Sequence, residues 1–166
     1  LEIAVQASLT GHLVLSTLHT NDAPSTITRL INMGLKPYLI TAALVAIISQ
    51  RLVKKICPDC KEEYTPGNDV ISELNFTDHD LQDKHFYRGK GCNSCNRTGY
   101  RGRMSILEVM IIDEEICSHV IKQSSTETLR EIARNNGMCT LVESGLNAVY
   151  DGLTTLEEVA RETSVN

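Results

Sequence analysis

Apolar residues in the first third of the chain follow helical and extended spacings in turn. Leu1, Val5 and Leu9 recur every four positions, which predicts the end of a largely buried helix closed by Gly11. Residues 12–18 form a compact, mostly apolar run of strand length, typical of an interior strand in a sheet with helices on both faces. The further elements expected here are a helix that Asn21 or Asp22 caps and Gly34 ends, a helix over about 37–48, and a strand over 51–56.

This order of helices and strands suits the last part of an α/β domain. The chain opens inside a helical pattern and without Met, so we interpret it as a piece of a larger protein. The composition changes at Cys57, and an alternating pattern then predicts another strand over 104–110. We expect this strand to pair with residues 51–56, which makes the stretch 57–103 an insertion within a hairpin.

Short amphipathic helices with clear start signals fill the rest of the chain. The expected N-caps are polar residues ahead of apolar stripes: Asp113, Ser124 and Thr154, the last two completed as capping boxes by Glu127 and Glu157. The predicted division of the chain is an α/β part over 1–56 with a returning strand at 104–112, an inserted module over 57–103, and a helical lobe over 113–166.

Composition places the chain among globular proteins. Hydrophobic residues make up 42% and charged residues 22% of the 166 positions. The longest apolar run, around 39–48, is far shorter than a membrane span. The net charge of -5 argues mildly against a dedicated nucleic-acid binder.

Two CxxC pairs carry the clearest chemical signal. Cys57 and Cys60 form one pair, Cys92 and Cys95 the other, and each spacing can present two thiolates to one ion. Four thiolates would make a closed, structural Zn²⁺ site, with glycines around the second pair that let backbone amides turn toward sulfur. The 31 residues between the pairs exceed the usual spacer, and redox dithiols or disulfides remain as alternatives. Outside these pairs, two cysteines in apolar helical context are expected to be buried bystander thiols: Cys117 and Cys139.

His19 closes the predicted strand over 12–18 and stands just ahead of a helix N-terminus. Ligands of open α/β sheets bind beyond the carboxyl ends of strands, and helix N-termini attract anions. A histidine there can donate a hydrogen bond to a terminal phosphate; equally, the polar residues after it can serve only as helix caps, with His19 incidental. His12, at the other end of the strand, is expected to be structural. The sequence contains no GxxxxGK[ST] phosphate-binding loop, so we expect the chain alone to hydrolyse no nucleotide.

Residues 7–23, ASLTGHLVLSTLHTNDA, resemble the histidine box of the secretion ATPases, the hexameric motors of type II secretion and type IV pilus assembly (the GspE/PilB family). The resemblance continues through further motifs in the family's order and covers nearly the whole chain. These motifs are QRLVKK at 50–55, CPDCK at 57–61, the stretch 91–103, and GLTTLEEV at 152–159.

The resemblance implies a fold and a function. The fold would be the C-terminal part of a RecA-like ATPase core, with an inserted four-cysteine zinc module and an α-helical C-terminal lobe. His19 would contact the γ-phosphate, while the Walker A and Walker B elements, and with them ATP and Mg²⁺, would belong to the full-length protein. That protein would be a cytoplasmic homohexamer, peripheral to the inner membrane, with an inner-membrane platform protein as its partner.

A zinc ribbon that binds nucleic acid is the alternative. Six basic residues and no acidic one occur over 84–103, which is a local positive patch. The helices after it are acid-rich, however, and do not offer the exposed basic recognition helix of a groove reader. We therefore expect no nucleic-acid partner.

Overall fold

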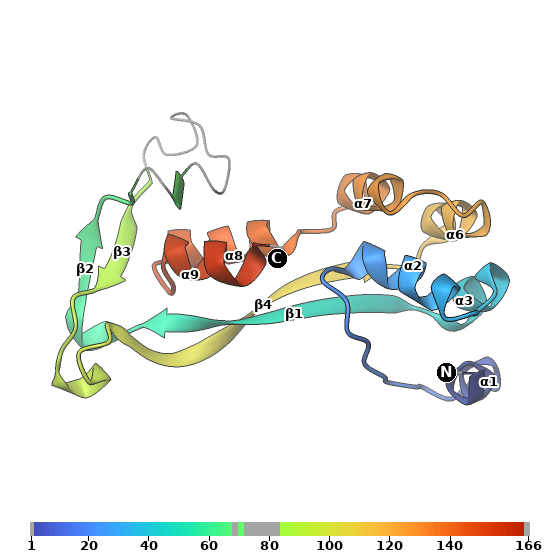
Figure 1. The fold of residues 1–166 in the computed structure, drawn as a ribbon, viewed down its shortest axis with the longest axis horizontal. Coiled ribbons are helices and arrows are strands. Elements are labelled where there is room, and N and C mark those ends of the chain that lie inside the picture. The colour runs from blue at the N-terminus through green and yellow to red at the C-terminus, as the bar shows by residue number, and fades with distance from the viewer. Residues whose placement is uncertain (1, 68–69, 72–83, 165–166) are drawn as a thin grey trace. The chain divides into compact units, whose positions relative to one another are not determined.

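The computed structural model describes residues 2–67, 70–71 and 84–164 (Figure 1). Its helices are α1 (Glu2–Leu9), α2 (Ala23–Asn32), α3 (Pro37–Ala43), α6 (Glu114–Ile121), α7 (Thr126–Asn135), α8 (Leu141–Tyr150) and α9 (Leu156–Thr163). Its strands are β1 (Ala46–Ile56), β2 (Lys61–Tyr64), β3 (Phe86–Gly89) and β4 (Tyr100–Ile111), with 3-10 turns at Pro58–Cys60 and Asn93–Cys95. The described residues form two compact units: unit 1 holds 1–49 and 108–140, and unit 2 holds 50–107 and 141–166.

The predicted hairpin partners are confirmed, because β1 and β4 pair in one two-stranded sheet. Both strands are longer than expected, and β1 includes residues that the helical pattern had assigned to the preceding helix. The helix expected over 37–48 ends at Ala43, and Ala46 already belongs to β1. That prediction was wrong at its end because Val45, Ile47 and Ile48 are β-branched and a long pairing partner is present.

The strand expected over 12–18 is absent from the described structure. These residues have no regular secondary structure and join no ladder, and Leu13 and Leu15 are 86% and 87% exposed. Extended backbone becomes a strand only when a neighbour accepts its hydrogen bonds, which no apolar pattern can supply. The helix ahead of it, α1, forms as predicted but is mostly exposed, with Val5 as its buried residue.

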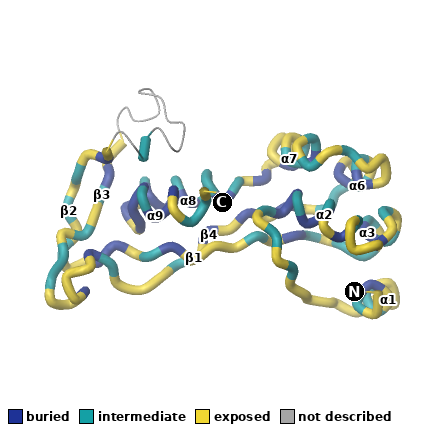
Figure 2. Tube along the Cα trace, in the orientation of Figure 1, coloured by how far each residue is buried: buried dark blue, intermediate teal, exposed yellow. Residues whose placement is uncertain are grey.

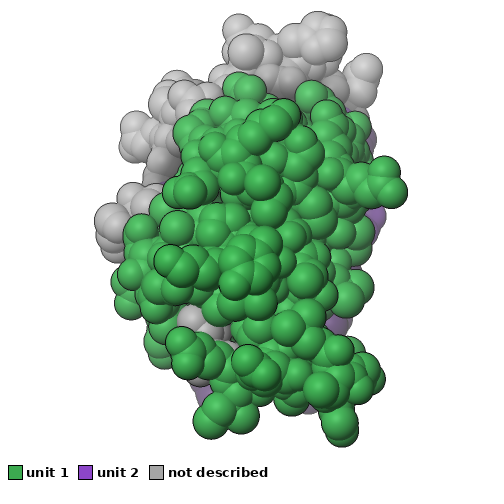
Figure 3. All heavy atoms as spheres, turned by 90° about the vertical axis from the view of Figure 1, so that its right-hand side faces the viewer, with its two compact units in different colours: residues 1–49, 108–140 green, residues 50–107, 141–166 purple. Residues whose placement is uncertain are grey.

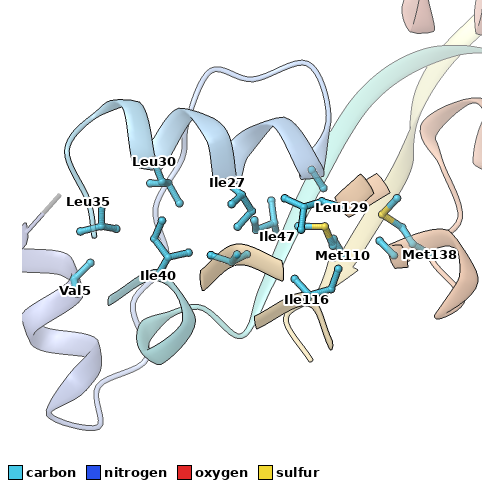
Figure 4. Packing of buried hydrophobic residues seen from close by; sticks show 13 residues of the cluster. Val5, Ile27, Leu30, Leu35, Ile40, Ile47, Met110, Ile116, Leu129 and Met138 are labelled. Carbon is cyan, nitrogen blue, oxygen red and sulfur yellow. The ribbon is translucent and has the colours of Figure 1, made fainter. Parts of the chain in front are cut away.

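Unit 1, green in Figure 3, has an aliphatic core. Figure 4 shows Leu30 of α2 facing Ile40 of α3, and Ile27 of α2 near Ile47 of β1. The cluster also takes in residues of α6 and α7, including Ile116 and Leu129. The helices of unit 1 are therefore held by shared burial of their apolar faces.

Unit 2 has a separate core around Phe86, Val149, Leu156 and Val159. Buried residues of α8 and α9 appear as dark blue stretches in Figure 2. The units thus differ from the predicted division, because α6 and α7 belong to unit 1 whereas α8 and α9 belong to unit 2. All helices of the stretch 113–166 were predicted from similar N-capping residues. The pair α6 and α7 nevertheless buries its apolar faces in one core, and the pair α8 and α9 in another.

Helix starts in the C-terminal stretch lie one residue later than two of the predictions. Asp113 caps α6 as predicted, but the caps of α7 and α9 are Ser125 and Thr155 rather than the preceding hydroxyl residues. The residue that precedes Thr155 makes a different contact, since the Thr154 hydroxyl donates to the Lys54 carbonyl at 2.8 Å. Where two hydroxyl residues adjoin, the pattern alone cannot tell which one caps.

Candidate functional site

The structure brings the two CxxC pairs together through a short hairpin. Lys61, directly after Cys60, is opposite Gly89 in the antiparallel β2–β3 pair. The Lys90 amide then donates to the Cys60 carbonyl at 2.9 Å, which leads the chain into Cys92. The pairing sits at the cysteine end of the spacer, so the length of the remaining spacer does not separate the two pairs (Figure 1).

The four sulfur atoms have the spacing of a tetrahedral thiolate site. All four Sγ atoms lie within 4.8 Å of one another. The separations are 3.8 Å for Cys57 and Cys92, 3.9 Å for Cys60 and Cys95, and 3.7 Å for Cys92 and Cys95. Four sulfurs that bind one Zn²⁺ at about 2.3 Å are about 3.8 Å apart along each tetrahedral edge. The cluster can therefore hold one metal ion of this size.

Backbone amides face two of the sulfurs, as the glycines around the second pair had indicated. The Cys60 sulfur accepts from the Gly91 amide at 3.3 Å. The Cys95 sulfur accepts from the amides of Cys92 at 3.1 Å and Gly99 at 3.3 Å. Amide donors of this kind stabilise negative charge on a thiolate.

The thiol pKa values follow burial and these donors. The Cys92 amide, helped by that of Gly99, outweighs burial and lowers the pKa of Cys95 to about 6. Burial raises the pKa of Cys57 and raises that of Cys60 to about 12. Binding of a metal ion by these thiols would release protons, because a thiolate and not a thiol is the ligand.

His19 lies at the end of the extended segment and ahead of α2, in unit 1. Its side chain is exposed and makes no hydrogen bond to any residue that the structure describes. The next residue is anchored, because the hydroxyls of Thr20 and Thr26 lie 2.8 Å apart in hydrogen-bond contact. His12 is also exposed, and its Nδ1 lies 3.0 Å from the Thr10 hydroxyl.

Carboxylates already occupy the N-terminus of α2. Asp22 accepts from the Ser25 amide at 2.8 Å, and Glu108 of β4 accepts from the Ala23 amide at 2.6 Å. Arg130 of α7 donates to Asp22 at 2.7 Å. The expected attraction of this helix end for anions is thus used by the protein's own side chains.

Sequence reasoning missed Glu108 and Arg130 as parts of this turn. A signal for Glu108 was present in the sequence, since it alternates with Ile106 and Met110 on the same face of the predicted strand. In the structure this face is buried, and Glu108 is 4% exposed. A charged residue at a buried position requires a partner. Arg130 had no such signal, because it lies beside the buried stripe of Leu129 and Ala133 on an amphipathic helix, where a half-exposed arginine is common.

The remaining cysteines, Cys117 and Cys139, belong to unit 1 and are not members of the four-cysteine cluster. Cys117 is half-buried, and burial raises the pKa of its thiol. Cys139 is exposed, so the expectation that it is buried was wrong. It follows α7 in the segment that leads to α8, where its neighbour Met138 rather than Cys139 enters the core.

Known proteins similar to this chain are secretion and pilus ATPases. The Type II/IV secretion system protein family matches residues 1–161. The type IV pilus assembly ATPase PilB of Thermus thermophilus is 46% identical over 162 residues, which are 98% of this chain and 18% of that protein. The type II secretion system protein HxcR of Pseudomonas aeruginosa is 43% identical over 162 residues, 98% of this chain and 30% of that protein.

Among solved structures, the pilus retraction motor PilT with bound ADP has a TM-score of 0.61 to this chain. Its sequence is 24% identical, and the match covers 99% of this chain and 36% of that one, so the likeness shows the fold. The chain spans between 18% and 32% of the length of the curated relatives it matches. In the part of the chain that the structure describes, no helix is long and apolar enough to cross a membrane.

Proposed function

Because this chain belongs to the Type II/IV secretion system protein family, we propose that it is the C-terminal part of an ATP-hydrolysing motor that drives protein export or pilin polymerisation. The observation that carries the proposal is the family match over 1–161, together with relatives named as pilus assembly ATPases and type II secretion proteins. The shared fold with a pilus retraction motor agrees with it.

The whole protein is proposed to work as a homohexamer in the cytoplasm, peripheral to the inner membrane. Its partner would be an inner-membrane platform protein, as the resemblance to the secretion ATPases implies. The nucleotide and Mg²⁺ would be held by Walker A and Walker B elements, whose phosphate-binding motif the present sequence does not contain. We therefore expect no ATP turnover by the chain on its own.

His19 is proposed to contact the γ-phosphate in the full-length motor. Its exposed imidazole is available for a new hydrogen bond, whereas the residues directly after it are bound within unit 1. Such a donor strengthens its contact as negative charge moves onto the phosphate oxygens in the transition state.

The test compares two exposed histidines at the ends of one extended segment. In the full-length motor, His19→Ala should lower kcat for ATP hydrolysis by about 10–10³-fold and leave ADP affinity nearly unchanged. His12→Gln is the matched control and should leave turnover within about 3-fold of the parent. Normal turnover in a folded His19→Ala protein would assign the phosphate contact to another residue.

The four-cysteine cluster is proposed to hold a structural Zn²⁺. The sulfur spacing supports this assignment, and four protein ligands leave no open position for water, so the ion would stabilise the fold rather than take part in the reaction. Cys60→Ser should abolish stoichiometric zinc and lower the thermal stability of unit 2, while Cys139→Ser should change neither. Metal analysis and thermal unfolding of the purified proteins test the assignment. A parent protein that is equally stable with and without zinc would refute it.

The nucleic-acid alternative receives less support from the module's surface. Arg88 pairs with Glu62 at 3.0 Å and Arg101 lies 3.5 Å from Asp59, so part of the basic stretch is already compensated. Salt-dependent binding to nucleic acid would be the observation that favours it.

A further inference from the structure

The turn that carries His19 is held from several directions. Thr20 is bound to Thr26 in the first turn of α2, and Asp22 is bound to the Ser25 amide. The third anchor comes from far along the chain, since the Ala23 amide donates to Glu108 of β4 at 2.6 Å. The backbone on the C-terminal side of His19 thus has a defined position, although its imidazole makes no hydrogen bond to any described residue.

Glu108 is the anchor that connects this turn to the sheet. Its side chain is 4% exposed and comes from a strand 85 residues away along the chain. Burying a carboxylate is costly unless hydrogen bonds and opposite charge compensate it. Here the α2 amide supplies a hydrogen bond, and the positive N-terminal end of the helix dipole favours the charge.

Arg130 offsets part of the negative charge at this helix end. It donates to Asp22 at 2.7 Å and also pairs with Glu127 on its own helix. The hydrogen bond to Asp22, with further attraction from Glu108, raises the pKa of Arg130. With both carboxylates in place, the amides of Ser25 and Ala23 already have acceptors and the local field opposes a further anion. A phosphate group near this turn would have to be met by the His19 side chain and not by the end of α2.

We propose that Glu108 is a positioning residue that sets the location of His19 by fixing the Ala23 amide to β4. The inference rests on the proposed role of His19 in ATP hydrolysis. Binding of ATP would depend on other parts of the motor, so loss of the anchor should lower kcat and leave KM nearly unchanged. Displacement of a reacting contact by about 1 Å can cost about 10²-fold in rate.

The test uses three substitutions of Glu108 in the full-length motor. Glu108→Gln keeps an oxygen for the Ala23 amide but removes the charge, and should stay within about 3-fold of the parent kcat. Glu108→Asp keeps the charge but withdraws the oxygen by one carbon, and should lower kcat by about 10–100-fold, as should Glu108→Ala if it folds. Normal kcat in Glu108→Asp together with low kcat in Glu108→Gln would show that charge, not position, matters, and would overturn the proposal.

Thr28→Val is the matched structural control. The Thr28 hydroxyl contacts that of Thr126 at 2.8 Å, so this variant loses a link between α2 and α7 without touching the turn. It should lower thermal stability slightly and leave kcat unchanged. If Thr28→Val lowered kcat as much as Glu108→Asp, the loss of activity would reflect a general destabilisation of unit 1. That result would contradict a positioning role for Glu108.

A double-mutant cycle separates this proposal from the proposed function. If Glu108 acts through His19, Glu108→Asp should have little further effect on kcat in a His19→Ala background. Full additivity of the two effects would overturn the positioning role even where each single variant is slow. Unchanged kcat in His19→Ala alone would instead refute the proposed role of the histidine, whatever the Glu108 variants do.

Discussion

At the scale of single residues, buried and half-buried carboxylates in this protein act as acceptors for backbone amides. Asp22 accepts from Ser25, Glu108 from Ala23, and Glu158 from Lys54 at 3.1 Å. Each joins a helix end or a strand to its neighbours, and two of them are less than 5% exposed. A charge-assisted hydrogen bond of this kind is stronger than a neutral one, which offsets part of the cost of burial.

Asp22→Asn should reveal the charge at the α2 N-terminus through its pH dependence. Burial raises the pKa of Asp22, but hydrogen bonds from Ser25 and Arg130 outweigh it and hold the pKa below the ordinary value of 3.8. The carboxylate therefore stabilises the fold fully above about pH 5, and this contribution is lost as pH falls through the folded-state pKa.

Asparagine keeps one oxygen for the Ser25 amide and still caps the helix, so the change removes the charge and the acceptor of Arg130. At pH 7 the variant should unfold with a free energy about 0.5–1 kcal/mol lower than the parent, measured by urea titration. The gap should close as the pH approaches about 2. Asp151→Asn, at an exposed aspartate, should show no gap at any pH. If the difference in unfolding free energy between Asp22→Asn and the parent grew at acid pH, the charge of Asp22 would not be the stabilising factor.

At the scale of helices and strands, adjoining hydroxyl residues determine where the C-terminal helices begin. The Ser125 hydroxyl accepts from the Thr128 amide at 3.2 Å and caps α7, while that of Ser124 contacts His119 Nδ1 at 3.0 Å. In the same way Thr155 caps α9 and Thr154 binds the carbonyl of Lys54 on β1. In each pair the second residue caps the helix and the first makes a different contact, although Thr155 also contacts the Tyr100 hydroxyl at 2.9 Å.

Alanine at the two serines should separate these roles. Ser125→Ala should lower the free energy of unfolding by about 1 kcal/mol, since an orphan amide of the first turn loses its acceptor. Ser124→Ala loses only a half-buried side-chain contact and should cost under about 0.5 kcal/mol. Denaturant titration of both variants measures the difference. The reverse order would support the capping box read from the sequence.

At the scale of the whole molecule, the described chain has two units with separate apolar cores, and the residues of β1 and of β4 are divided between the two units. The core of unit 1 is aliphatic and is built by α2, α3, α6 and α7 with strand residues. Unit 2 combines a smaller core with the four-cysteine cluster. A metal ion would therefore support the unit with the smaller apolar cluster.

Removal of the metal should act on the two units unequally. Chelation of zinc-loaded protein should speed hydrogen exchange of backbone amides in β2, β3 and the turn at Asn93–Cys95, because repulsion and reprotonation of the thiolates loosen the cluster. Amides in the core of unit 1, around Ile27 and Met110, should exchange at an unchanged rate. Exchange that rose equally in both units, or in neither, would contradict a structural metal confined to unit 2.

Local chemistry in the sequence determined several helix starts and the two thiol pairs. Asp22 and Asp113 cap helices as predicted, and each CxxC spacing places two sulfurs in one cluster, because caps and paired thiols depend on residues close together along the chain. The meeting of the two pairs, 31 residues apart, depends on the β2–β3 pairing. The pairing of β1 with β4 was also predicted correctly, since alternating apolar residues flank the insertion.

Tertiary structure decided the features that need a distant partner. Residues 12–18 have a strand-like pattern without a ladder, while 46–48 leave a helical pattern to lengthen β1, because strands exist only through their neighbours. The contact of Glu108 with the Ala23 amide joins positions 85 residues apart, and no local spacing encodes it. The role of His19 likewise depends on this packing, since the sequence supplies the imidazole but the fold determines where it stands.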